Sequence, residues 1–459
     1  MCDDGPNRDG KKRQLTSTTG TSKGLLGWLT PTRSAVSDSD GRSCDGSGST
    51  LDRRSYMQLA GGATAAAVMG GVASTTAAAG TDDDEDGSGR TLDVTDEAYG
   101  ANGDGTGNDT GALQAAIDDA EAGDTVYLPA GTYAIEGAET LVEINGNAHA
   151  SNFSIEGDGP DTVVRYEGGN GGSNFFMFRF VNGPAGVEIR NLVLDGNAGV
   201  VSGDPVVTQC IGLSNDAEAT DLLVEDVVVR DAYRTGVSVR EHGITFRYCT
   251  FEGCGAHGID FRVGHTSDNP LVIENCRATG NVHRHPGHYG IDTATGSFVV
   301  RDTVVDGNGG GTKTSHTDEV DGLYQRVRVQ DNGGVAYQST NGNVGTLVFE
   351  DCVYADNASP MRLSFIDYEI RGELVVTGNS DVGILTTDGG QIVNADEIWC
   401  NNNSGEGLAG GPGDIDVYHH HSNGSPGGDG YSIDEVNEDE KTDLDDVPTA
   451  DDVGAWADE

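Results

Sequence analysis

Short runs of alternating apolar and polar residues recur through the middle of the chain, with Gly, Asn and Asp between them. Alternation with a period of two places every second side chain on one face of a β-strand, and the intervening residue types favour turns. The runs form units that repeat with a period of roughly 21 to 32 residues. The units cover residues 221–239, 243–261, 271–293, 298–314, 323–337, 347–363 and, more faintly, 374–386.

No single unit of this kind can bury its own apolar face, but stacked units form a continuous interior. Each short strand then pairs with the equivalent strands of the coils above and below it, about 4.8 Å away. The pattern therefore predicts an all-β protein, a right-handed parallel β-helix over residues 93–405.

A short helix is predicted ahead of the repeats, over residues 110–120. Its apolar side chains are spaced so that they share one helix face: Leu113, Ala116, Ile117 and Ala120. Solenoids need a cap over the apolar interior at each open end. We expect this helix to cap the N-terminal end of the coil.

The stretch from 98 to 133 contains the segments Ala-Asn-Gly-Asp-Gly and Tyr-Leu-Pro-Ala-Gly-Thr-Tyr, and residues 154–163 read Ser-Ile-Glu-Gly-Asp-Gly-Pro-Asp-Thr-Val. These segments resemble the first coils of pectate-lyase-like β-helix enzymes, a group that includes polygalacturonases, rhamnogalacturonases and related lyases and epimerases. The resemblance covers about residues 93–400 and implies the β-helix fold and activity on a polysaccharide. It does not imply one reaction, because this superfamily hosts several chemistries.

Charge changes the picture of possible partners. The chain has 75 acidic residues against 27 Lys and Arg, a net charge of −48. Such a surface repels phosphate backbones, which argues against a nucleic-acid partner. The acid-rich and lysine-poor composition instead resembles that of proteins from extreme halophiles, whose surface charges are screened within about 3 Å in molar salt.

The N-terminal region is typical of an exported protein. Arg53 and Arg54 precede an Ala- and Gly-rich run that ends in Ala-Ala-Ala at residue 79. This resembles a twin-arginine signal over residues 51–80, and the alternative is a fortuitous arginine pair before a flexible linker. The protein is therefore expected to be secreted or attached to the cell surface.

The segments around the signal and the β-helix are polar. Residues 1–50 form a polar extension before the signal, and residues 81–92 form an acidic linker after it. Residues 406–459 are rich in Gly, Asp and Glu, which predicts an acidic and disordered tail. We expect no stable membrane span in the mature protein.

Six cysteines follow the predicted signal, and their spacing matches no zinc site. Cys249, Cys276 and Cys352 occupy the same position in different repeats, which predicts an inward-facing stack of small apolar side chains. A disulfide between Cys249 and Cys276 stays open as an alternative.

The last strand of each repeat begins after a Gly or Pro, and the second residue beyond it lies between mostly apolar neighbours. This residue is expected to face solvent, because adjacent side chains of a strand point in opposite directions. The outward column reads Ser238, Asp260, Asp292, Lys313, Ala336, Arg362 and Leu385. Arg240 and Arg262 occupy the next outward position. Lys313 is the only lysine between the acidic linker and the acidic tail, which favours a functional column over an arbitrary polar surface.

These residue types suit the removal of the C5 proton from a uronic acid. That proton becomes acidic when calcium or arginine neutralises the sugar carboxylate. Asp260 and Asp292 are candidate calcium ligands and catalytic residues, Lys313 is the candidate base, and Arg262 and Arg240 are candidates for binding the substrate carboxylate. Two nearby carboxylates favour the charged lysine, so a neutral base requires the arginines or a bound cation to offset them.

The order Gly-Ile-Asp, Gly-Ile-Asp, Gly-Thr-Lys on successive coils resembles the calcium-dependent, lysine-based pectate lyases of polysaccharide lyase family 9. This resemblance implies an acidic polysaccharide as substrate, cleaved by β-elimination. It makes a calcium-assisted lyase the leading interpretation of the column.

Further candidates lie beside this column. The insertion at residues 281–289 enters the strand of Asp292, so it is expected to overhang the column. Its polar side chains are candidates for substrate binding or proton transfer: His283, His285, His288 and Tyr289. Arg362 is a further candidate for substrate binding. Candidates that complete a calcium site follow Lys313: His316, Asp318, Glu319 and Asp321.

Three alternatives stay open. Two carboxylates about 5 Å apart also suit a retaining glycoside hydrolase, although the set of polygalacturonase signatures is missing from the sequence. Tyr289-Gly-Ile-Asp292 resembles the Tyr-Gly-Phe-Asp start of the mannuronan C5-epimerase motif, but Thr293-Ala294 replaces the Pro-His that comes next in that motif. A non-catalytic cell-surface or glycan-binding solenoid would present a flat face without a charge-coupled cluster.

Overall fold

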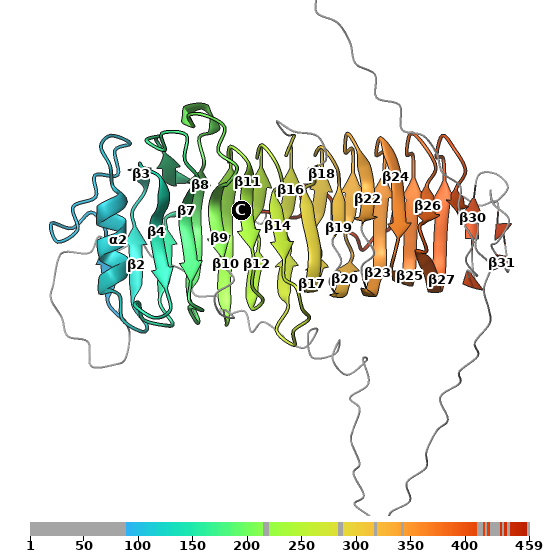
Figure 1. Ribbon diagram of the computed structural model, residues 1–459, viewed down its shortest axis with the longest axis horizontal. Coiled ribbons are helices and arrows are strands. Elements are labelled where there is room, and N and C mark those ends of the chain that lie inside the picture. The colour runs from blue at the N-terminus through green and yellow to red at the C-terminus, as the bar shows by residue number, and fades with distance from the viewer. Residues whose placement is uncertain are drawn as a thin grey trace, which may run out of the picture. The chain divides into compact units, whose positions relative to one another are not determined.

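The computed structural model describes residues 89–213, 220–282, 288–315, 319–340, 344–410, 416–417, 420–422, 432–433, 436–437 and 441–456. Parallel strands dominate these residues and stack as coils along one axis (Figure 1). The predicted right-handed parallel β-helix is confirmed. The predictions for residues 1–80, namely the polar extension and the export signal, lie outside the described residues.

Each coil contributes strands to three faces, named first, second and third in chain order. The third face carries the outward column and stacks β4 (Glu139–Asn145), β7 (Phe175–Val181), β9 (Thr208–Leu213), β11 (Thr235–Val239), β14 (Ile259–Arg262), the start of β17 (Ile291–Arg301), β19 (Thr312–Ser315), β22 (Val335–Thr340), β24 (Ser359–Ser364), β26 (Ile384–Thr387) and β28 (Leu408–Gly410).

The other two faces share several long strands. The first face stacks β1 (Thr91–Asp93), β2 (Thr125–Leu128), β5 (Ser154–Gly157), β8 (Glu188–Asp195), β10 (Leu222–Arg230), β12 (Ile244–Arg247), β15 (Leu271–Glu274), the end of β17, β20 (Glu319–Gln325), β23 (Val344–Ala355), β25 (Asp367–Thr377) and β27 (Gln391–Asn401). The second face consists of the later parts of β8, β10, β23, β25 and β27 together with β3 (Gly131–Ile135), β6 (Thr162–Tyr166), β13 (Thr250–Glu252), β16 (Arg277–Thr279), β18 (Val304–Asp306) and β21 (Arg328–Gln330). Short elements complete the described chain: η1 (Gly159–Asp161), η2 (Ala198–Val200), β29 (Asp416–Val417), β30 (His420–Ser422), β31 (Ser432–Ile433) and β32 (Val436–Asn437).

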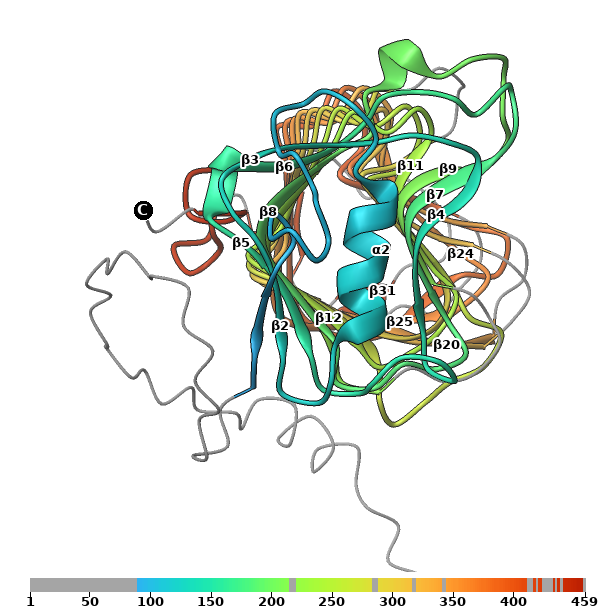
Figure 2. The same ribbon diagram turned by 90° about the vertical axis from the view of Figure 1, so that its left-hand side faces the viewer.

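The predicted capping helix is confirmed as α2 (Thr110–Asp119), which lies across the N-terminal opening of the coil (Figure 2). Its inward face is the predicted one, because Leu113, Ala116 and Ile117 are at most 2% exposed. The side chain of Asp109, immediately before the helix, accepts hydrogen bonds from the backbone N–H groups of Asn102 and Ala134. These bonds tie the cap to the first coil.

The interior contains the predicted cysteine stack. Cys249, Cys276 and Cys352 are fully buried, and the backbone N–H of Cys249 lies 3.4 Å from the Sγ of Cys276. The inward orientation is therefore confirmed. All six described cysteines carry free thiols, so the alternative of a Cys249–Cys276 disulfide is not what the structure contains.

A column of asparagines, all buried except the half-buried last one, runs along the turns between the second and third faces, and we call it the asparagine ladder. Its members, one on each successive coil, are Asn281, Asn308, Asn332, Asn357, Asn379 and Asn403. The carboxamide oxygen of each later member accepts from the backbone N–H of the asparagine one coil earlier, as in the 2.9 Å bond from the Asn308 N–H to Asn332. At every step except Asn357 to Asn379, the earlier side-chain amide donates to the same oxygen at 2.9–3.1 Å. The ladder satisfies turn amides that would otherwise be buried without partners.

A ladder of charges covers the outer side of the first face. Arg247 contacts Glu225 at 3.2 Å and Glu274 at 2.6 Å, and Glu274 also accepts a 2.7 Å bond from Arg301 on the following coil. Burial raises the pKa of Glu274, but hydrogen bonds from the two arginines outweigh burial and hold the pKa below its usual range. Neighbouring coils are thus linked by ion pairs on the outside and by neutral amides inside.

Residues 441–456 pack against the outside of the coil, so the prediction of a disordered tail does not hold for this segment. Leu444 and Val447 are at most 7% exposed and cluster with Val353 and Val375. The Arg328 guanidinium fixes the segment, donating to Asp443 at 2.6 Å and to the backbone carbonyls of residues 447 and 448. No helix among the described residues is both long and apolar enough to cross a membrane.

Candidate functional site

The third face brings together the three residues that the repeats placed on consecutive coils. Asp260 pairs in register with Asp292, and Asp292 pairs with Lys313. The full outward row reads Glu143, Arg179, Gly212, Ser238, Asp260, Asp292, Lys313, Gln338, Arg362, Leu385 and Ala409. The predicted order of residues in the column is correct at every position but one, but the expected exposure to solvent is wrong for Ser238, Asp260 and Asp292, which are buried.

The incorrect position is Ala336, which was expected beside Lys313. Gln338 occupies that place in the register, and Ala336 is fully buried. Counted between residues that pair in register, the turn before β22 is one residue longer than the turn before β19, and Gly334 lies one residue earlier in it than Gly311 does in the other turn. Alignment of the two glycines therefore placed the register two residues short. A slip of two residues keeps each side chain on the same face, so alternation alone cannot detect it.

Asp260 lies between the two predicted arginines. Arg262 Nε donates to Asp260 Oδ1 at 2.7 Å, and Arg240 Nη2 donates to Oδ2 at 3.1 Å. Burial alone raises the pKa of the Asp260 carboxyl group, but Arg240 and Arg262 outweigh burial and hold this pKa below its usual range. Asp260 is therefore an anion with a cation at each oxygen.

Asp292 is fully buried and contacts cations from two neighbouring coils. Its Oδ2 lies 3.2 Å from Lys313 Nζ and 3.7 Å from Arg262 Nη2, while Oδ1 accepts from the backbone N–H of Ala294 at 3.2 Å. We call Arg240, Asp260, Arg262, Asp292 and Lys313 the site cluster. Its three cations against two carboxylates make it locally positive in a chain of net charge −48.

Tyr289 forms the wall beside Lys313. The Lys313 ammonium lies 5.3 Å from the centre of the Tyr289 ring, and the phenol donates to Gln338 Oε1 at 2.5 Å. Burial, with a smaller contribution from Asp292, raises the pKa of Tyr289 to about 12. The phenol therefore stays protonated at neutral pH and can act as a proton donor.

His257 and His288 border the cluster on the side of the insertion. His257 Nδ1 accepts a hydrogen bond from the backbone N–H of Tyr289 at 3.1 Å, so a neutral His257 carries its proton on Nε2. This Nε2 atom lies 3.0 Å from His288 Nδ1 and 3.8 Å from Asp292 Oδ2. Burial lowers the pKa of His257 despite the nearby carboxylates. The sequence pointed to His288 but not to His257, which directly precedes a Gly-Ile-Asp segment, nor to Gln338, whose place in the row was assigned to Ala336. His283, His285, His316 and Asp318 lie outside the described residues.

The described carboxylates do not fit a calcium site. Asp260 and Asp292 present their oxygens to guanidinium and ammonium groups instead of to an open cavity, and these cations would repel Ca²⁺ from the oxygen ligands that it requires. No group of three or more His, Cys, Asp or Glu among the described residues is arranged to hold a metal ion. The arrangement can instead receive the carboxylate of an anionic sugar.

Parts of the chain are similar to known proteins. Residues 92–284 match the family described as "Rhamnogalacturonase A/epimerase, pectate lyase-like". Mannuronan C5-epimerase AlgE2 of Azotobacter vinelandii is 32% identical over 241 residues, which cover 48% of this chain and 22% of that protein. Alginate lyase 7 of the same organism is 32% identical over 195 residues, which cover 40% of this chain and 22% of that protein. The matching region thus spans about a fifth of each relative.

The solved A-module of A. vinelandii mannuronan C-5 epimerase AlgE4 superposes with a TM-score of 0.56 and 19% identity, covering 77% of this chain and 99% of that module. At this identity the superposition establishes the fold alone. Residues 92–284 are thus similar to a pectate-lyase-like family, and the coil shares the parallel β-helix fold of the AlgE4 A-module.

Proposed function

We propose that this protein is an enzyme that acts on a uronic-acid polysaccharide by removing the C5 proton of a uronate, with β-elimination as the outcome. The observation that carries the proposal is the site cluster, whose cations surround two buried carboxylates on consecutive rungs of an outward row. A bound uronate carboxylate would find the positive charge needed to stabilise the enolate formed at C5. Relatives that are named uronan epimerases and lyases support the same substrate class.

In this mechanism Arg240 and Arg262 receive the substrate carboxylate, the role that we assign to arginine in place of calcium. Lys313, in its unprotonated form, accepts the C5 proton on Nζ. Arg262 lies 2.7 Å from Asp260 and 3.7 Å from Asp292, the two carboxylates of the site cluster. The C4–O4 bond then breaks, a C4–C5 double bond forms, and the protonated Tyr289 donates its proton to the departing O4.

Epimerisation is the second candidate function, favoured by the similarity to mannuronan C5-epimerases. It shares the removal of the C5 proton and differs only in the next step, in which the carbanion is reprotonated at C5 from the opposite face. Tyr289, the residue that aligns with the start of the epimerase motif, is protonated at neutral pH, and this reaction requires that it donate its proton to C5 from the face opposite Lys313. No bond of the polymer backbone breaks in this reaction.

The test is incubation of the full chain in high salt with pectate, polymannuronate and polyguluronate. Elimination is followed by the ultraviolet absorbance of the unsaturated product, and epimerisation by proton NMR of the polymer. We expect product from one uronan, at a rate that survives chelation of calcium. Lack of both products on every uronan would refute the proposal.

Lys313→Met should abolish turnover without unfolding the protein. Lys441→Met is the matched control, because Lys441 is the other described lysine and pairs with Glu373 at 2.5 Å on the outside of the coil, away from the row. Equal activities of the two variants would remove Lys313 from the mechanism.

A further inference from the structure

Two arginines of the described chain form no ion pair with a described carboxylate, in a protein where acidic residues outnumber basic ones by 75 to 27. Every other described arginine lies within 4 Å of such a carboxylate, whereas Arg179 and Arg362 do not. Both belong to the outward row of the third face, on opposite sides of the site cluster. Acidic side chains are abundant on this protein, yet none of the described ones pairs with Arg179 or Arg362. Two unpaired arginines on one row therefore indicate a binding site for an anionic ligand.

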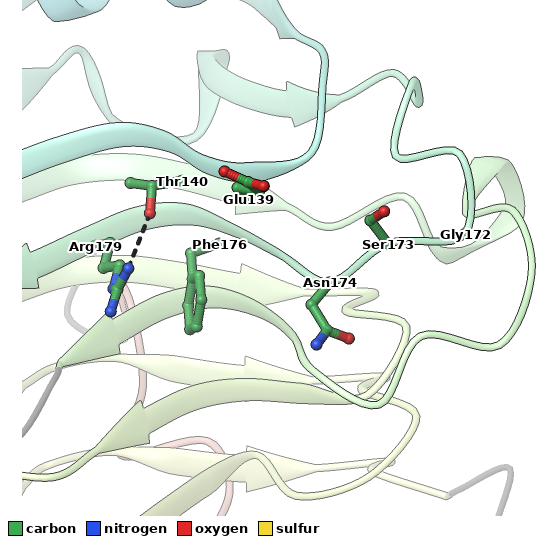
Figure 3. Close-up of a pocket in the computed structure, with 7 residues that line it drawn as sticks. All are labelled: Glu139, Thr140, Gly172, Ser173, Asn174, Phe176 and Arg179. Carbon is green, nitrogen blue, oxygen red and sulfur yellow. Dashed lines mark hydrogen bonds between the residues drawn. The ribbon is translucent and has the colours of Figure 1, made fainter.

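Arg179 lines a hollow of about 530 Å³ on the third face (Figure 3). Its guanidinium lies 5.0 Å from the centre of the Phe176 ring and donates to the Thr140 hydroxyl at 3.3 Å. Glu139 and Asn174 line the same hollow from its rim. An aromatic ring, a cation and hydroxyl or amide partners together can bind a sugar acid, because the ring packs against the apolar face of a pyranose while the polar groups bind its carboxylate and hydroxyls.

The backbone around this hollow is unusual in two respects. Glu139 has a φ of 67°, a left-handed conformation that costs a non-glycine residue on the order of 1–3 kcal/mol. Gly212 lies against the Phe176 ring, and a Cβ at this position would come within 2.5 Å of the ring. The hollow therefore has a rim residue, Glu139, in a strained backbone conformation, and a residue without a side chain, Gly212, against the Phe176 ring.

We propose that the Phe176–Arg179 hollow is a distal subsite that binds a uronate unit of the polysaccharide away from the reacting bond. The proposal rests on the proposed function of the site cluster. Arg179 and Asp260 are three rungs apart, about 14 Å, in a straight row parallel to the coil axis. A pyranose unit in an extended polymer is similar in length to one rung, so a chain bound along the row places a uronate about three units away at Arg179.

The experiment compares Arg179→Gln with the unaltered protein on oligouronates of increasing length. We expect KM for long oligomers and polymer to rise by about tenfold, the loss of one charge-assisted hydrogen bond, with kcat within about twofold. For di- and trisaccharides, which are too short to reach from the site cluster to Arg179, KM should not change. Arg190→Gln is the matched control, because Arg190 lies on the first face and pairs with Glu188 and Glu225.

Gly212→Ala provides a second variant that leaves Arg179 and Thr140 unaltered but displaces the Phe176 ring and the neighbouring Gln209 side chain, and it should show the same dependence on oligomer length. If Arg179→Gln and Gly212→Ala both fold and KM for long oligomers stays within twofold, the subsite is refuted while the proposed reaction stands. Calorimetric titration of the inactive Lys313→Met protein with long and short oligomers tests the subsite without turnover. A tighter Kd for long oligomers that is lost with Arg179→Gln supports it, and equal Kd values refute it. If the unaltered protein neither binds nor converts any uronan, the proposed function itself fails.

Discussion

Replacement of Asp292 by Asn should destabilise the protein more than replacement of its partner Lys313 by Met. Asp292 is fully buried, whereas the Lys313 side chain is 18% exposed and can turn its ammonium toward water. Removal of one partner from a buried pair costs roughly 3–5 kcal/mol, because the other charge stays buried without compensation. The surplus of positive charge in the site cluster makes the two removals unequal.

The inequality follows from counting charges. Asp292→Asn leaves three cations of the site cluster facing one carboxylate, while Lys313→Met leaves two cations facing two carboxylates. In the second case Asp292 still has Arg262 at 3.7 Å. We therefore expect a loss of about 3 kcal/mol for Asp292→Asn and of about 1 kcal/mol for Lys313→Met. The double variant should recover about 1–2 kcal/mol of the sum, because the two residues interact directly.

Urea unfolding of the four proteins, followed by fluorescence at one fixed salt concentration, measures these free energies. Repetition in molar salt should change the difference by less than half, since buried pairs are screened less than exposed ones. A larger loss for Lys313→Met than for Asp292→Asn, or a coupling energy within about 0.5 kcal/mol of zero, would show that the cluster is not held by this balance of charges.

Three further predictions concern stability. Asn332→Ala in the middle of the asparagine ladder should cost about 3 kcal/mol in urea unfolding, because it leaves the Asn308 N–H and other buried groups without partners, and a loss below about 1 kcal/mol would contradict this. Burial lowers the pKa of His257, so the unfolded chain binds a proton below about pH 6.5 before the folded protein does. The free energy of unfolding should therefore decrease as the pH is lowered below about 6.5. His257→Gln should remove part of that slope in urea titrations at several pH values, and an unchanged slope would be the contrary result. Arg328→Gln should release residues 441–456 from the coil, seen as faster limited proteolysis in that segment than in the unaltered protein.

The coil, its cap and the row of Asp260, Asp292 and Lys313 could be predicted from sequence, because each depends on local periodicity. Alternation fixes which side chains face outward, and repeated Gly-Ile-Asp segments fix the register between adjacent coils. Prediction was wrong at Ala336, where the length of one turn sets the register and periodicity carries no information about it.

The cations around the carboxylates required the structure. Sequence reasoning placed Arg240 and Arg262 beside Asp260 but assigned the carboxylates to calcium, since it could not show that a guanidinium occupies each oxygen of Asp260. Phe176 and Arg179 were not found, because the coils before residue 221 carry long loops that hide their repeat. The ladder asparagines do recur every 22–27 residues, but so many other Asn residues occupy turns that this spacing identifies them only once their burial is known.

The asparagine ladder has a consequence for how the protein responds to ionic strength. Ion pairs such as those of the first face weaken as salt rises, but hydrogen bonds between neutral amides do not depend on screening. The ladder runs beside the coils that hold Asp260 through Arg362, from its first bond at the Cys254 N–H to its last at Asn403. The axial distances between the charges of the row are therefore set by an uncharged spine. A polymer that binds along the row meets the same spacing of charges in dilute buffer and in brine.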